Sequence, residues 1–572
     1  MKRTAAFFIL VLLVVAGWAT HQDVPPHPAV SLARLMPQNA LLFLEAHDFA
    51  AVLREWNSSS EKQLWLSGDN HEVFSRSRLF LRLKQAQDEF ASAVGLPPDM
   101  SFLSDVAGEQ SALGVYDIGK LEFLYITQLS SARPMKSEIW QQRAQFETRE
   151  IEGKQFYVRT DPQSGRVVAF AMDDQYLVLG AREDLVAAAL SLLANPKTAA
   201  LSQQGWFVDA MKAAKDPGEL RLVVHLAEVT RTPQFRTYWV QQNITELRQY
   251  ESSVSDLFRS SNTYREERTL LLRNTPENAA DTVDAGPQVT ELMRLVPPET
   301  GFYRAFAAPL VEDSLALLEQ KVLTPRLGPT PVSKIAPSVA SGEQSAGNQS
   351  NLDVRIDTPP SSNGEDANGD GELREMLRKA NVRAALQLHS SEADGDGVFV
   401  RLHSTIVLRG VAEWEEPVAQ QAIQAILSPG LTASRLGVTW QKAGTGAQSY
   451  SELDGLAKVA IAVRGKCLFV SNDPATLQTV LARISQPVSA EPAIYYAGFD
   501  HNRERQNFFR LTALIDQPTR TNAAGEEGRE PQFFSQNVAS LSKTLAGVKS
   551  QSIVAKRAGR VETQTVRYEW AQ

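Results

Sequence analysis

The sequence predicts an α+β protein with two related halves, each an antiparallel sheet with helices packed on one face. Short polar turns join apolar runs of strand length, and polar residues alternate along these runs, which is typical of hairpins. A strand–turn–strand–helix unit at Val167 to Leu193 returns at Lys458 to Ile484, with similar elements flanking both copies. A chain of 572 residues is also too long for one hydrophobic core, so two or more domains are expected.

The repeated unit consists of two apolar runs around a short turn, followed by an apolar-periodic helix. In the first copy the turn is Asp173-Asp174-Gln175, and Gly180-Ala181 precedes the helix. Val168 then aligns with Val459 of the second copy. Chance similarity of two hairpins is the alternative interpretation, but the shared flanking elements favour a duplication. The two copies lie about a domain length apart, which argues against a solenoid with its period of roughly 20–50 residues.

The domain limits follow from the matching order of elements. Residues 20–35 are expected to be a linker, 36–275 the first α+β domain and 290–572 the second. Within the second domain, residues 324–371 are rich in Pro, Ser, Gly and Asn. Such a segment buries too little apolar surface to offset its conformational entropy, so a disordered insertion is predicted there.

Individual elements are predicted from apolar periodicity. Asn39 to Ala46 predicts a buried strand, with Asp48 as the N-cap of the next helix, and Ser75 to Val94 predicts an amphipathic helix. Phe235 to Phe258 is expected to be largely helical. Two closing strands, ending with Val561 to Trp570, are assigned to the second domain.

The N-terminus predicts export. Lys2 and Arg3 precede the uncharged apolar run Ala5 to Gly17, and Ala19 offers a cleavage point. The run is shorter than the ~20 residues that usually span a bilayer, so residues 1–19 are a signal peptide or a retained signal anchor. The chain is expected in the bacterial periplasm or cell envelope, with membrane contact only through this segment.

Composition narrows the possible partners. The formal net charge of −8 argues against nucleic acid, because binding phosphates requires an excess of Lys and Arg. The single cysteine, Cys467, allows no intrachain disulfide. Its place in an apolar run favours a small buried hydrophobe over a catalytic thiol.

The opening of the fold and the repeated unit resemble a known group of proteins. Pro37, Asn39, Ala40 and Phe43 form a Pro-x-Asn-Ala-x-x-Phe start, and the unit recurs over Phe170 to Leu190 and Ile461 to Leu481. This pattern is similar to an exported bacterial family of envelope proteins, classed as a domain of unknown function, in which the unit repeats. The resemblance implies an envelope location and supplies no catalytic residues.

One segment has the order of a calcium loop. Asp366, Asn368 and Asp370 place oxygen ligands at alternate positions before Gly371, as in D-x-N-x-D-G. Leu377 occupies the twelfth position, where a bidentate Glu would be expected. A solvated acidic linker is therefore the favoured interpretation of this segment. Calcium binding is the alternative interpretation, and no other cofactor is expected.

The remaining motifs favour binding over catalysis. His389 and His403 are placed to pair across one hairpin, but spacing suggests no third metal ligand, so sheet histidines with satisfied hydrogen bonds are expected. The sequence has no His-Glu-x-x-His, Gly-x-Ser-x-Gly or phosphate-loop motif. We expect a non-enzymatic binding or scaffold protein, with an envelope protein as a possible partner. The alternative is an extracytoplasmic hydrolase whose site is assembled from distant residues.

Overall fold

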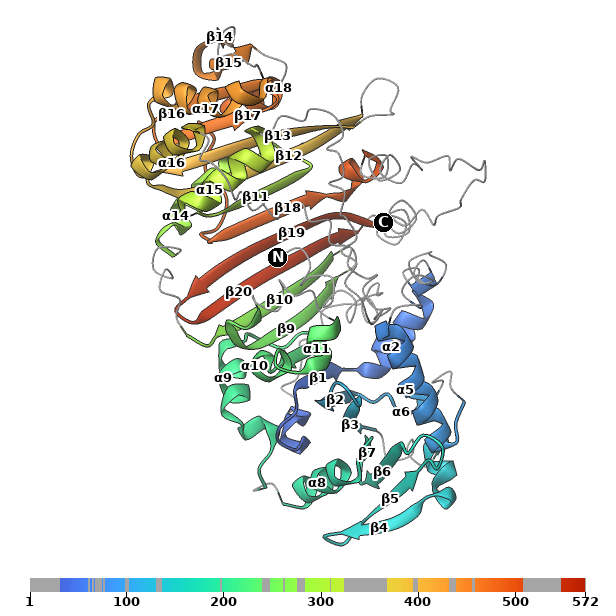
Figure 1. The fold of residues 1–572 in the computed structure, drawn as a ribbon. Coiled ribbons are helices and arrows are strands. Elements are labelled where there is room, and N and C mark those ends of the chain that lie inside the picture. Colours follow the sequence, from blue (N-terminus) through green and yellow to red (C-terminus); the bar gives the residue numbers. More distant parts are fainter. Residues whose placement is uncertain are drawn as a thin grey trace, which may run out of the picture. The chain divides into compact units, whose positions relative to one another are not determined.

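A computed structural model describes most of the chain from residue 31 onward (Figure 1). The described residues are 31–59, 62, 63, 66, 75, 78–97, 102–129, 136–195, 198–238, 247–260, 263–274, 283–308, 310–323, 368–393, 400–431, 439–454, 458–507 and 547–570. The predicted signal segment and most of the predicted insertion, residues 324–367, lie outside these ranges. Within these ranges, no helix combines the length and the apolar character needed to cross a membrane.

The chain is α+β and divides into two compact units. The first comprises Met1–Thr275, Lys543–Gly547 and Gly559–Gln572, and the second comprises Pro276–Ser542 and Val548–Ala558. All strand pairings described within the units are antiparallel.

In the first unit the strands lie in the order β4-β5-β6-β7-β3-β2-β1-β8-β9-β10-β20. Their bounds are β1 (Leu42–His47), β2 (Gln110–Asp117), β3 (Glu122–Gln128), β4 (Glu147–Ile151), β5 (Lys154–Thr160), β6 (Val167–Asp173), β7 (Tyr176–Gly180), β8 (Leu220–Val224), β9 (Tyr250–Ser260), β10 (Thr263–Leu272) and β20 (Val561–Trp570). The helices are η1 (Leu32–Leu35), α2 (Phe49–Ser58), α5 (Arg78–Val94), α6 (Leu103–Val106), α7 (Glu138–Gln141), η3 (Gln142–Gln145), α8 (Glu183–Ala194), η4 (Leu201–Gln203), α9 (Gly205–Ala213), α10 (Leu226–Val229) and α11 (Pro233–Tyr238).

In the second unit the strands lie in the order β14-β15-β16-β17-β13-β12-β11-β18-β19. Their bounds are β11 (Phe302–Ala307), β12 (Val382–Ala393), β13 (Val400–Gly410), β14 (Thr439–Ala443), β15 (Tyr450–Asp454), β16 (Val459–Arg464), β17 (Cys467–Ser471), β18 (Tyr495–Asp500) and β19 (Val548–Ala558). The helices are α14 (Gly286–Leu292), η5 (Met293–Leu295), α15 (Val311–Leu318), the π-helical turn η6 (Glu319–Leu323), α16 (Asn368–Ala380), α17 (Glu416–Leu431), η7 (Gly446–Gln448) and α18 (Pro474–Leu481).

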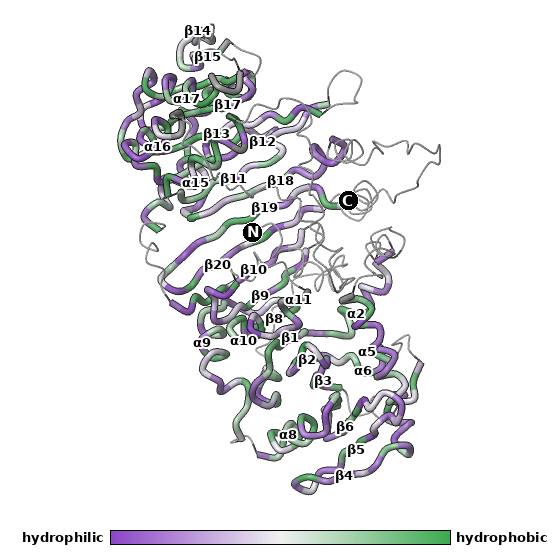
Figure 2. Tube along the Cα trace, viewed as in Figure 1, coloured by the Kyte–Doolittle hydropathy of each residue, from purple (hydrophilic) through white to green (hydrophobic). Residues whose placement is uncertain are grey.

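Helices cover both faces of the sheet around β6 in the first unit and around β17 in the second, so the prediction that they pack on one face is wrong. Side chains alternate along a strand, and on β6 Val168 and Phe170 enter one core while Ala169 and Ala171 enter another. The first core packs against α5, α6 and α7, and the second against η1, α8 and α9. Helix α8 is largely green in Figure 2 because its residues are mostly apolar. Since both alternating sets are buried, one helical layer cannot cover the sheet.

The second unit is layered in the same manner. On β17, Leu468 and Val470 pack in a core with α15, α16 and α17, whereas Cys467 and Phe469 pack in a core with α14 and α18. Cys467 is a buried free cysteine, which confirms the prediction for this residue. Burial, the largest influence, raises the pKa of its thiol, so the sulfur stays protonated at neutral pH.

The repeated unit forms as predicted in both places. The β6–β7 hairpin pairs Asp173 with Tyr176, and the β16–β17 hairpin pairs Arg464 with Cys467. Each loop therefore has two residues, and its first residue has positive φ, 51° at Asp174 and 55° at Gly465. The predicted N-cap is also confirmed, because Oδ1 of Asp48 accepts a hydrogen bond of 2.8 Å from the amide of Ala51.

Two predictions about strands are wrong. Tyr250 to Phe258 is not helical but forms most of β9, which pairs with β8 on one side and β10 on the other. The closing strands do not both belong to the second unit: β20 pairs with β10 along nearly its whole length, from Thr263 opposite Glu569 to Leu271 opposite Val561. In both cases, pairing with a sequence-distant strand decides the structure.

Two buried carboxylates tie distant elements together in the first unit. Glu45 on β1 accepts hydrogen bonds from the amide of Leu32 (2.7 Å), the hydroxyl of Ser31 (2.8 Å) and the amide side chain of Gln110 (2.9 Å). Asp256 on β9 forms a bidentate ion pair with Arg221 on β8 at 2.7 and 2.8 Å. Both side chains of that pair are at most 5% exposed.

We predict that Asp256→Ala destabilises the protein by about 3–5 kcal/mol, because it leaves the Arg221 guanidinium buried without its counter-charge. Denaturant unfolding of the full chain measures this. Glu147→Ala is the matched control. Glu147 pairs with Arg149 on the surface, where the two side chains are 73% and 50% exposed, and such exposed ion pairs contribute about 0–1 kcal/mol to stability. Equal losses in the two variants would contradict the prediction.

The second prediction concerns pH. Burial, opposed by nearby Glu251, lowers the pKa of His225, whose ring stacks on Trp206 at 4.3 Å. The imidazole therefore binds a proton more weakly in the folded protein than in the unfolded chain, so unfolding near or below about pH 6.5 is accompanied by proton uptake. Wild-type stability should fall more between about pH 8 and about pH 5.5 than that of His225→Gln. Thermal unfolding of both proteins at the two pH values measures this. An equal fall in melting temperature for wild type and His225→Gln would contradict the prediction.

Candidate functional site

A cavity of about 450 Å³ lies in the first unit, between α5 and the sheet. Strands β1, β2 and β3 form its floor, and α5 and α6 form its opposite wall. Its lining consists of Leu44, Ala46, Phe49, Leu83, Ala86, Gln87, Phe90, Phe102, Leu103, Val106, Ser111, Ala112, Leu113, Val115, Leu121, Phe123, Tyr125, Arg166, Leu179 and Leu220. The lining is almost wholly apolar.

The floor of the cavity is one face of three neighbouring strands. On β2, Leu113 and Val115 face the cavity and are only half-buried, whereas Ala112, which also borders the cavity, is fully buried and packs in the core on the α8 side. The same alternation holds on β3, where Phe123 lines the cavity and Leu124 is fully buried. The apolar side chains on the cavity face are therefore incompletely covered by the protein itself.

Helix α5 fails to fill this space because of its residues. Ala86, half-buried on the cavity side, is too short to reach the floor. Leu83, also on the cavity side, is 45% exposed. Further along the helix, Phe90 closes one end by packing against Phe102 and Phe123, with ring centroids 6.0 and 5.8 Å away.

The hydroxyl groups in the lining are bonded within the protein. Tyr125 donates to the carbonyl of Val106 at 2.9 Å and lies 3.1 Å from the hydroxyl of Ser111. Ser111 also contacts Thr127 at 2.6 Å. Burial raises the pKa of Tyr125 to about 12, so its phenol is uncharged at neutral pH. The interior thus favours an apolar occupant over water, which needs two to four polar partners.

The charged group of the lining is the guanidinium of Arg166. Its Nη2 lies 2.7 Å from Oε2 of Glu89 on α5, and its Nη1 donates to the carbonyl of Lys120 at 3.0 Å. Arg82 lies 3.9 Å from the other Glu89 oxygen. Burial acts to raise the pKa of Glu89, but the hydrogen bond and charge of Arg166 outweigh it and lower the pKa, so the carboxylate stays ionised.

The predicted calcium loop is only partly described. Asp366 lies outside the described residues, and Asn368 and Asp370 fall in the first turn of α16. Helix α16 thus begins three residues before the predicted end of the insertion. Among the described residues no group of three or more His, Cys, Asp or Glu side chains could hold a metal. Calcium binding at this loop stays a prediction.

The two histidines of the second unit do not pair across the hairpin as expected. His389 lies opposite Ser404 and His403 opposite Ser390, so the two residues are one position out of register and point to opposite faces. His389 contacts the hydroxyl of Ser404 at 2.7 Å, and Ser404 is fully buried, so this contact belongs to the packing of the sheet.

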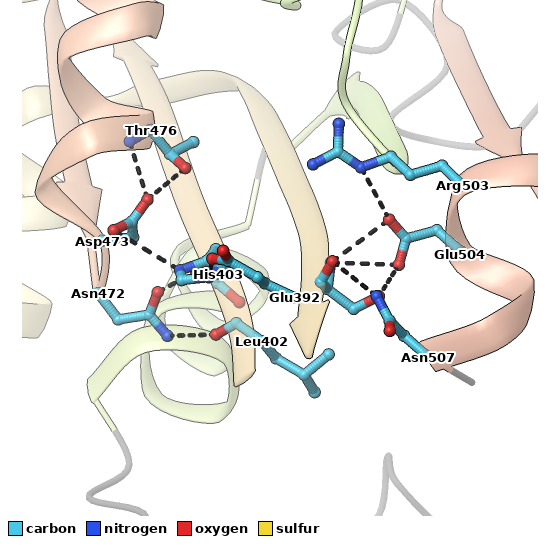
Figure 3. A network of polar contacts seen from close by, with 11 residues as sticks. Glu392, Leu402, His403, Asn472, Asp473, Thr476, Arg503, Glu504 and Asn507 are labelled. Carbon is cyan, nitrogen blue, oxygen red and sulfur yellow. Dashed lines mark hydrogen bonds and ion pairs between the residues drawn. The ribbon is translucent and has the colours of Figure 1, made fainter. Parts of the chain in front are cut away.

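His403 belongs to a polar network at the ends of β12 and β13 (Figure 3). Its ring nitrogens lie 3.2 Å from Glu392 and 3.6 Å from Asp473. Asp473 caps α18 by accepting from the amide of Thr476 at 2.9 Å, and Asn472 accepts from the amide of Ser404 at 2.7 Å. These contacts hold the ends of the loops on the sheet. The carboxylates of Glu392 and Asp473 therefore have a structural role.

The second half of Figure 3 is built around Glu504. This buried carboxylate accepts hydrogen bonds from the amide and hydroxyl of Ser391, and Asn507 donates to the Ser391 carbonyl at 3.0 Å. Arg503 lies 3.4 Å from Glu504. The helical residues 501–507 are thereby held on the end of β12.

No family model matches the chain, and no curated protein matches it. Two solved structures, crystal forms I and III of TP0453, are 12% identical to the chain. They cover 46% of it and 86% and 88% of their own chains, with TM-scores of 0.23 and 0.24, which do not establish a shared fold.

Sequence reasoning missed the cavity. Its signal was present in α5, where the partly exposed Leu83 and the short Ala86 precede Phe90 on the side that lines the cavity. Periodicity identifies the inner face of a helix, but it does not show whether that face reaches the strands below.

We predict that Ala86→Leu stabilises the protein by about 0.5–2 kcal/mol, because the added carbons enter unoccupied space. Ala189→Leu on α8 is the matched control. Ala189 is fully buried in a filled core, so the same change there should destabilise by about 1–3 kcal/mol. Denaturant unfolding compares the two, and a similar loss in both would contradict an open cavity under α5.

Proposed function

We propose that this chain is an exported, non-enzymatic binding protein that holds an aliphatic chain in the cavity under α5. The observation that carries the proposal is the apolar cavity of about 450 Å³. Small-molecule sites in proteins commonly measure about 300–1,000 Å³ and are lined mainly by apolar and aromatic side chains. The cavity is of this size and has this lining.

The energetics favour an apolar ligand. The protein leaves Leu44, Leu113 and Val115 only half-buried where they line the cavity. Covering apolar surface contributes roughly 25 cal/mol per Å², and the surrounding strands already hold these residues in place. The hydroxyls of Ser111 and Tyr125 are engaged with other protein groups, so a polar ligand would lose its water without gaining partners from them.

Binding is supported better than catalysis at this site. Acid–base chemistry requires converging titratable groups with shifted pKa values, whereas the lining supplies Arg166 as its charged group. The lining therefore supports the binding of a ligand over hydrolysis.

We further infer that the two units arose by duplication. Reading from the edge, the first unit runs β4-β5-β6-β7-β3-β2-β1-β8-β9, and the second runs β14-β15-β16-β17-β13-β12-β11-β18-β19. Each strand corresponds to the one ten places later. This agreement supports membership in the envelope family that the repeated unit resembles, and with it export by the N-terminal segment.

The experiment is displacement of N-phenyl-1-naphthylamine, an apolar fluorescent probe, from the purified chain by hexadecanol. We predict that wild type binds both molecules and that Ala86→Trp weakens binding about tenfold or more, since the indole would occupy the cavity.

Asp88→Trp is the matched control because Asp88 is exposed on the same helix. It should bind like wild type. If neither molecule binds wild type, or if both variants bind equally well, the proposed function is wrong.

A further inference from the structure

We propose that the ligand is a single-chain amphiphile with a carboxylate head, a long-chain fatty acid, whose head binds Arg166 while its chain enters the cavity. This inference rests on the proposed function and specifies the ligand. Its basis is the position of Arg166, which belongs to the lining and is 10% exposed as a side chain. An apolar cavity with a cation at its edge complements a chain with one anionic end.

The structure holds Arg166 in place from two sides. The carbonyl of Lys120, in the turn between β2 and β3, accepts from Nη1 at 3.0 Å, and Glu89 on α5 accepts from Nη2 at 2.7 Å. Leu121, the next residue of the turn, lines the cavity. The guanidinium therefore lies where the turn, α5 and the apolar lining meet.

Glu89 shows that this location accommodates a carboxylate. One of its oxygens contacts Arg166, and the other accepts from Gln85 at 2.7 Å and lies 3.9 Å from Arg82. Arg82 is itself bonded to the carbonyl of Gly119 at 3.4 Å. Two arginines anchored to one turn thus surround a single carboxylate group of the protein.

The donors of Arg166 leave room for a second carboxylate. Its Nη1 donates to the carbonyl of Lys120, and its Nη2 contacts Glu89. A guanidinium has five N–H donors, and planar carboxylates match its geometry. A ligand carboxylate can therefore share Arg166 with Glu89 or replace it.

The test compares hexadecanoate with hexadecanol, which have the same chain and differ in the head, by displacement of N-phenyl-1-naphthylamine at neutral pH. Wild type should bind the acid more tightly.

Arg166→Gln should weaken acid binding about tenfold or more while changing alcohol binding little, because a charged hydrogen bond is lost. Glu89→Gln should tighten acid binding about two- to fivefold by releasing Arg166 from a competing partner.

Arg149→Gln is the matched control, because Arg149 on β4 is half-exposed and pairs with Glu147 and Glu183 outside the lining. It should leave both ligands unaffected. Thermal unfolding verifies that each variant is folded.

The outcomes separate the two proposals. If wild type binds neither compound, the proposed function itself fails. If the alcohol binds as tightly as the acid, or if Glu89→Gln weakens acid binding, the cavity binds chains but the carboxylate inference is overturned. Hexadecyl phosphate serves as a further arm, and tighter binding of it than of hexadecanoate would also overturn the choice of a carboxylate.

Discussion

The structure depends on the burial of both faces of the sheet around β6 in the first unit and around β17 in the second. On β6 and β17, successive side chains enter different cores, so neither set can be exposed without uncovering apolar surface. Each unit therefore carries two helical layers, one on either side of the sheet. The quality of fit between a helix and the strands beneath it then decides whether a region is filled or open.

Helix α5 is where this fit is incomplete. On the opposite face, α8 presents Leu185, Val186, Ala189 and Leu190, all buried. In the second unit, α15 and α16 bury leucines such as Leu318 and Leu377 against the sheet. At α5, Ala86 stands over half-buried floor residues, and the result is a cavity instead of a core. The candidate site is thus a local departure from the layering that stabilises the rest of the protein.

Much of the fold could be predicted from local patterns. The hairpin at Asp174, the cap at Asp48 and the burial of Cys467 follow from turn chemistry and apolar runs. The strand β9 could not, because Tyr250 to Phe258 adopts its structure through pairing with β8 and β10. The one-residue offset of His389 and His403 is likewise fixed by register, which a single sequence leaves open. The cavity was missed because it depends on a gap between two elements, and neither element reveals it alone.

The most direct test of the account is a crystal structure of the chain with a fatty acid that carries bromine at the end of its chain, using anomalous scattering to locate the halogen. The account predicts a bromine peak inside the cavity, among Phe90, Leu113 and Tyr125, with the carboxylate beside Arg166. A peak at another place in the described fold, or an ordered chain with its head directed inward, would contradict it.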